Sequence, residues 1–286
     1  MSSKIIGRPD SQLHWTQTAL GSYLLQWEQQ RCDEAVADIF GYYSLQLGLP
    51  LLQGLRANRM PHRWQALESA QALQDWEQER AQNPAAADHG LTPVLLADPV
   101  ALPFAEACLD LLVLPHTLET SSDPHAVLRE AARVLVPEGR LVICGLNPMS
   151  LLGLQRRLER GNSYLPGLGW GPGYGRLRDW LRLLAFEIEA VQFGGYVPAV
   201  QSARWLRRWQ VMDRVGPVGW PVLGGVYCVV AVKRVVGMRL LGPSWKARSA
   251  MVGAPVAARR QPADAAASVV GPGPDRKTDQ GGGWEI

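Results

Sequence analysis

The sequence predicts an α/β fold with a mostly parallel sheet and helices on both faces. Three observations within residues 98–148 carry this prediction. The uninterrupted apolar run at 111–114 is typical of a buried strand in a parallel sheet. Asp123-Pro124 then offers an N-cap and a first helical residue, and apolar residues recur after it at helical spacing. A second apolar run at 141–144 completes the strand–helix–strand order of a βαβ unit.

The other elements follow from apolar periodicity. Helices are predicted over 11–31, 71–82, 151–160, 176–184 and 202–214, and strands over 44–48, 62–67, 94–97, 186–193 and 226–232. The stretch 161–175 is too rich in glycine for a regular element, and is either a substrate loop or a long connector. The helix at 202–214 carries an apolar stripe beside four arginines. Such a helix can lie on a membrane surface, but we favour packing on its own domain.

Composition suggests three parts: an N-terminal helical segment (1–38), a main domain (39–243) and a disordered tail (244–286). The net charge of +3 is too small to indicate a nucleic-acid partner. We expect a cytoplasmic chain, because no apolar run approaches a membrane span and residues 1–10 lack an apolar signal core. The sequence gives no indication of the oligomeric state.

The four cysteines are widely spaced and form no C-x-x-C pair. We interpret them as reduced thiols of the core rather than as a disulfide framework or a zinc site. No metal ligand is therefore predicted.

The 98–148 stretch resembles class I S-adenosylmethionine-dependent methyltransferases of the UbiE/COQ5-like (type 11) group. The resemblance rests on an ordered series of short motifs: Asp98, Leu102-Pro103-Phe104, Asp110, His116-Thr117-Leu118-Glu119, Asp123-Pro124 and Arg133-Val134-Leu135-Val136-Pro137-Glu138-Gly139. It implies a Rossmann-like class I methyltransferase fold with a mostly parallel seven-stranded sheet, and S-adenosyl-L-methionine as cofactor. The alternative is a generic βαβ unit in another doubly wound protein.

The resemblance also implies which residues hold the cofactor. In the glycine-rich loop after the first strand, Gln46 stands at the position of the family's acidic residue and Gly48 at the first glycine. Asp98, followed by Pro99, is placed to accept a hydrogen bond from the adenine amino group, although it also suits a turn. Pro115 and His116 end the fourth strand, which in the family borders the sulfonium and the methyl acceptor.

The loop after Gly48 departs from the family pattern, because Leu49, Pro50, Leu51 and Leu52 replace the later glycines. Their side chains narrow the space for a cofactor, and Pro50 lacks a backbone donor. Gln46 can form hydrogen bonds but carries no charge. Glu68 lies near the position of the acid that holds the ribose hydroxyls in the family.

The expected function is a methyltransferase acting on a small-molecule or lipid-like acceptor. His116 is the candidate catalytic residue, because imidazole titrates near neutral pH, and Glu119 is placed to orient it. Methyl transfer mostly requires positioning, so no catalytic dyad is needed, and both residues also suit a purely structural role. The alternative is an inactive relative that keeps the fold as a binding or regulatory module, which the altered loop favours. Nucleophile-elbow, Walker and His-Glu-x-x-His motifs are absent from the sequence.

Overall fold

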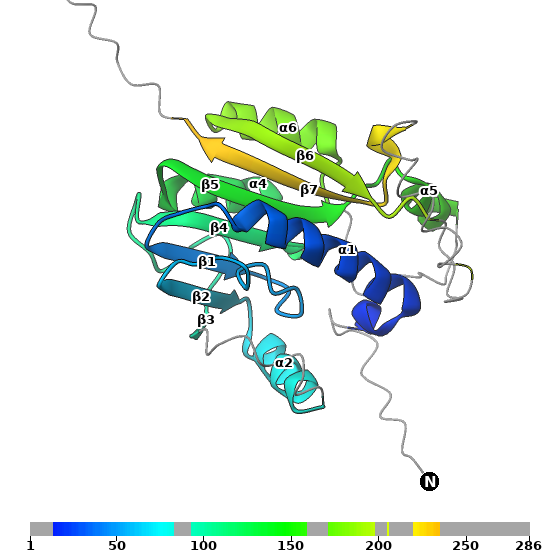
Figure 1. Cartoon of the computed structure of the whole chain (residues 1–286), viewed down its shortest axis with the longest axis horizontal. Coiled ribbons are helices and arrows are strands. Elements are labelled where there is room, and N and C mark those ends of the chain that lie inside the picture. The colour runs from blue at the N-terminus through cyan, green and yellow to red at the C-terminus, as the bar shows by residue number, and fades with distance from the viewer. Residues whose placement is uncertain (1–13, 83–92, 159–170, 198–204, 206–219, 235–286) are drawn as a thin grey trace, which may run out of the picture. The chain divides into compact units, whose positions relative to one another are not determined.

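The computed structural model describes residues 14–82, 93–158, 171–197, 205 and 220–234 (Figure 1). The chain divides into two units, 1–237 and 238–286, and all described residues lie in the first. The predicted tail, almost all of the predicted 202–214 helix and most of the glycine-rich stretch lie outside the described residues. The proposed domain boundaries stay a prediction.

A seven-stranded sheet forms the centre of the first unit, with the order β3-β2-β1-β4-β5-β7-β6. Its strands are β1 (Tyr43–Leu47), β2 (His62–Leu67), β3 (Val94–Leu96), β4 (Leu109–Pro115), β5 (Leu135–Leu146), β6 (Phe186–Gly194) and β7 (Val226–Lys233). The pairs among β1 to β5 are parallel, whereas β7 is antiparallel to both of its neighbours, β5 and β6. The predicted mostly parallel, seven-stranded sheet is therefore confirmed.

Helices cover both faces of this sheet (Figure 1). The described helices are α1 (Ala19–Val36), α2 (Ala70–Gln82), α3 (Thr117–Thr120), α4 (Pro124–Val134), α5 (Leu151–Leu158) and α6 (Tyr174–Leu183), with short 3-10 turns at His14–Gln17 and Pro221–Leu223. Apolar residues of α1 pack on one face, and those of α4 and α6 pack on the other. None of the described helices combines the length and the apolar character that crossing a membrane requires.

The α4 segment confirms the capping prediction and corrects the position of the following strand. Asp123 accepts a hydrogen bond from the backbone N of Ala126 at 2.9 Å, and Pro124 is the first helical residue. The apolar run at 141–144 predicts the next strand there, but β5 begins at Leu135. Leu135 already pairs with Leu109 of β4, so neighbouring-strand pairing extends the strand beyond its apolar run.

The loop between β1 and β2 belongs to the core on the α1 face. Leu49 and Leu52 are buried there with Trp15, Leu20 and Leu24. Burying a leucine side chain stabilises a fold by roughly 1.5–3 kcal/mol. The residues that replace the family's glycines therefore anchor the loop to α1.

Candidate functional site

The strand order reverses between the parallel neighbours β1 and β4, because the chain continues from β1 to β2 on one side of the sheet and from β4 to β5 on the other. In open α/β sheets, ligands bind at the carboxyl ends of the strands beside such a switch point. Gly48 follows β1, and His116 follows β4. The structure thus brings the predicted residues of the first and fourth strand ends to one edge.

Only glycine fits at position 48. Its φ of +108° is disfavoured for other residues, and a Cβ would lie 2.6 Å from Thr117 Oγ1 and 3.0 Å from the Pro115 carbonyl oxygen. The Thr117 hydroxyl in turn donates to the Leu47 carbonyl oxygen. The space next to Gly48 is therefore occupied by the end of β4.

Gln46 holds the loop after β1 in place. Its side-chain amide donates to the carbonyl oxygens of Leu49 and Leu52, and its Oε1 accepts from the backbone N of Gly54 at 2.8 Å. The residue is 2% exposed, so these bonds form away from water. A glutamine satisfies all three partners because it both donates and accepts, which a carboxylate does not.

His116 lies between two buried carboxylates. Its Nδ1 is 2.6 Å from Oε2 of Glu119, and its Nε2 is 3.0 Å from Oε2 of Glu28 on α1. The Trp15 ring contacts the imidazole edge-on, with 5.1 Å between ring centroids. The other Glu119 oxygen accepts from the backbone N of Leu146, whereas Oε1 of Glu28 is buried and has no hydrogen-bond partner among the described residues.

The two carboxylates keep His116 protonated. Burial alone would lower the pKa of His116, but the charges of Glu28 and Glu119 outweigh it and hold the pKa well above its usual value. Burial raises the pKa of Glu28. Since both ring nitrogens are engaged, His116 acts in this arrangement as a fixed cation that joins α1 to the ends of β4 and β5. Its catalytic role stays a prediction, and would require one of these contacts to open.

This arrangement predicts that stability falls with rising pH. An unfolded histidine titrates near about pH 6.5, so the stability that His116 contributes is complete below that value and is lost as pH rises through its higher folded pKa. The raised pKa of Glu28 acts in the same direction. We expect the free energy of unfolding, measured with urea, to decrease by up to about 1.4 kcal/mol per pH unit above pH 6.5.

A triple variant, His116→Phe with Glu28→Gln and Glu119→Gln, provides the control, because it keeps the shape of the cluster without its titrating groups. Its urea series is expected to lack this slope. Equal slopes in the two chains would contradict a protonated His116.

A second group of polar residues lies at the carboxyl ends of β2 and β3. Asp98 is exposed after β3, and its Oδ1 accepts from the backbone N of Val100 at 3.0 Å, as in a turn, while Pro99 is buried. Glu68 directly follows β2 and accepts from the Thr120 hydroxyl at 2.9 Å. Burial raises the pKa of Glu68, the hydrogen bond from Thr120 lowers it, and the charge of Asp98 raises it further.

The sequence alone did not identify Glu28 as a site residue. The feature that could have identified Glu28 is its position on α1. It is a charged residue on the same helix face as Leu20 and Leu24, at four-residue spacing. The partner of such a residue lies in another element, here His116 at the end of β4. Its identity therefore depends on how α1 packs against the sheet.

Sequence comparison finds similarity to a methyltransferase family model and to two curated proteins. Residues 54–143 match the family model described as "Methyltransferase domain". "Uncharacterized protein YafS" of Escherichia coli is 34% identical over 151 residues, which cover 53% of this chain and 59% of that protein. "Biotin biosynthesis bifunctional protein BioHC" of Cellvibrio japonicus is 32% identical over 100 residues, 35% of this chain and 18% of that protein. The matches thus span less than two thirds of either relative.

Solved structures share the fold at low sequence identity. A Thermotoga maritima protein described as a SAM-dependent methyltransferase superposes with a TM-score of 0.52 at 15% identity, covering 78% of this chain and 100% of that chain. A second match is a chain from a Haloferax volcanii complex between the Trm112 methyltransferase activator and a methyltransferase. It superposes with a TM-score of 0.55 at 15% identity, covering 80% of this chain and 98% of that chain. S-adenosylmethionine (SAM) is the cofactor that the description of the Thermotoga protein names. The described part of the chain has the Rossmann-like class I methyltransferase fold, and residues 54–143 match the methyltransferase domain family.

Proposed function

We propose that the chain is a cytoplasmic S-adenosylmethionine-dependent methyltransferase that acts on a small-molecule or lipid-like acceptor. The observation that carries the proposal is the alignment of Gly48, Glu68 and Asp98 at the carboxyl ends of three adjacent strands, β1, β2 and β3. A nucleoside laid across these ends would meet a close-packed glycine, then one acid for the ribose and one for the adenine. Four free cysteines fit a reducing compartment.

In this proposal the cofactor-binding residues are Gln46, Gly48, Asp98, Pro99, Pro115 and His116, with Glu68 added as the ribose-binding acid. Carboxylate oxygens are suited to accept from both ribose hydroxyls. The bound cofactor would supply an electrophilic methyl group. The chain's own residues would hold the nucleoside and exclude water, and the charged cluster around His116 would fix the end of β4 beneath it.

The name of the Cellvibrio relative places that protein in biotin biosynthesis, and this supports a small molecule as the acceptor here. Gly171, at the described end of the glycine-rich stretch, lies against Glu119, since a Cβ there would be 2.6 Å from Glu119 Cγ. This contact supports a substrate loop beside the end of β4. No transmembrane or nucleic-acid partner is part of the proposal.

Calorimetric titration with S-adenosylmethionine tests the proposal directly. We expect binding to the intact chain and a roughly 10- to 100-fold weaker affinity in Glu68→Ala, because hydrogen bonds to a charged group contribute about 1.5–3 kcal/mol. Glu77→Ala, an exposed glutamate on α2, is the matched control and should bind like the unchanged chain. Absence of heat and of a thermal shift at millimolar cofactor would rule out the methyltransferase.

The second candidate is a non-catalytic module with the same fold. It is favoured by the loop after β1, in which Leu49 and Leu52 are buried and Gln46 bonds three backbone groups. Such a loop is stable without a cofactor. The titration separates the two candidates, because the module predicts an intact fold with no affinity for S-adenosylmethionine.

A further inference from the structure

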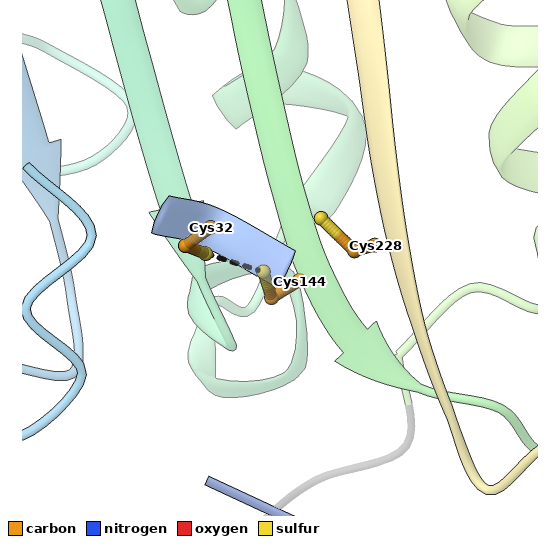
Figure 2. A group of neighbouring side chains, drawn as sticks. All are labelled: Cys32, Cys144 and Cys228. Carbon is orange, nitrogen blue, oxygen red and sulfur yellow. Dashed lines mark hydrogen bonds between the residues drawn. The ribbon is translucent and has the colours of Figure 1, made fainter. Parts of the chain in front are cut away.

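Three of the four cysteines meet in the core, although they are far apart in the sequence. Cys32 lies on α1, Cys144 on β5 and Cys228 on β7, and Figure 2 shows their side chains converging. The three sulfur atoms lie within 4.8 Å of one another, and Sγ of Cys32 is 3.3 Å from Sγ of Cys144. All three residues are at most 3% exposed.

Regular secondary structure produces this convergence. Cys144 and Cys228 are directly opposite in the antiparallel pairing of β5 and β7, so their side chains point to the same face of the sheet. Cys32 lies four residues after Glu28 on the buried face of α1, which packs over these two strands. No C-x-x-C pair marks the cluster in the sequence, because each thiol comes from a different element.

The spacing of the sulfur atoms is close to that around a shared metal ion, and Cys32 and Cys144, whose sulfur atoms are 3.3 Å apart, would separate slightly on binding one. With metal–sulfur bonds of about 2.3 Å, thiolates around one ion are about 4 Å apart. A disulfide would use only two of the three thiols, and all four cysteines of the chain are free. Apolar packing alone does not require three thiols at one point, because valine or alanine fills such positions.

We propose that Cys32, Cys144 and Cys228 form a three-thiolate site for a soft metal ion. Thiolate donors select Cu(I) and zinc over hard cations. Within the described residues, no histidine, aspartate or glutamate completes the group as a fourth ligand. Structural zinc normally takes four protein ligands, so Cu(I), which accepts three, is the better fit.

Metal ions bind to the deprotonated thiolates, so metal binding to this cluster would release protons from the thiols.

An ion at this point would join α1 to β5 and β7. The same helix carries Glu28, whose carboxylate holds His116, so the metal would stabilise the framework of the candidate site. This proposal does not depend on S-adenosylmethionine binding. The two titrations use different ligands, and either can fail alone.

Anaerobic titration of the reduced full-length chain with Cu(I), and separately with Cd²⁺, tests the site. We expect one ion per chain, a thiolate-to-metal charge-transfer absorption and a higher melting temperature. Cys108→Ser, which changes the remaining, partly exposed cysteine, is the matched control and should behave like the unchanged chain. Cys32→Ala, Cys144→Ala and Cys228→Ala should each lose the absorption.

X-ray absorption of the Cu(I)-loaded, unchanged chain adds a measurement that does not depend on the folding of any variant. Three sulfur neighbours at one distance would support the site. The proposal fails if neither ion gives the absorption, even after the chain is refolded in its presence. It also fails if the absorption persists in the three alanine variants.

Discussion

Replacing His116 with alanine is expected to lower the free energy of unfolding by about 3–5 kcal/mol at neutral pH, because it leaves two buried carboxylates without their cation. Glu28 is 0% exposed and Glu119 is 6% exposed, so water does not compensate for the lost charge. Chemical denaturation with urea measures the loss. The exposed His62, changed to alanine, is the control and should cost much less.

The origin of this loss can be isolated by removing the carboxylates as well. In the His116→Ala background, Glu28→Gln and Glu119→Gln should recover part of the stability, because a neutral amide is cheaper to bury than an unpaired charge. The same two substitutions in the unchanged chain should destabilise it. A loss below about 1 kcal/mol for His116→Ala, or equal effects of the amides in both backgrounds, would contradict a charged cluster.

The fold could be predicted from the sequence wherever the local residue pattern matches the burial that the residue has in the structure. The run at 111–114 is buried on both sides and forms the centre of β4, and Asp123-Pro124 caps α4 as its chemistry requires. The predicted strand at 141–144 is shorter than β5. The first residues of β5, from Leu135, are extended because they pair with β4 and not because they form an apolar run. Short-range pattern does not contain that information.

The sequence predicts that Gly48, Asp98 and His116 follow strand ends, but it does not predict which side chains pack around them. Gly48, Asp98 and His116 lie at the carboxyl ends of β1, β3 and β4, where the resemblance to methyltransferases put them. The contribution of Glu28 and the meeting of the three cysteines depend on the packing of α1 over the sheet. Both are contacts between elements distant in sequence, which spacing along the chain does not reveal.

Gln46 is the residue whose replacement tests both the fold and the function. Gln46→Leu keeps the volume but leaves the N–H of Gly54 and two loop carbonyls without their buried partner. Each such group costs about 1–3 kcal/mol, so we expect a loss of about 3–4 kcal/mol in urea unfolding after some relaxation. Gln30→Leu, on the exposed side of α1, is the matched control and should change stability by less than about 0.5 kcal/mol.

The affinity of the Gln46 variant for S-adenosylmethionine distinguishes the two candidate functions. If the loop is a preorganised wall of the cofactor site, loosening it adds an ordering cost to binding, and the titration should show a weaker affinity at a temperature where the variant stays folded. This is the result that the methyltransferase proposal requires. If Gln46 instead closes the site of a non-catalytic module, the variant should bind the cofactor more tightly than the unchanged chain. The direction of this single change therefore decides whether the altered loop is an adaptation of the methyltransferase site or its replacement.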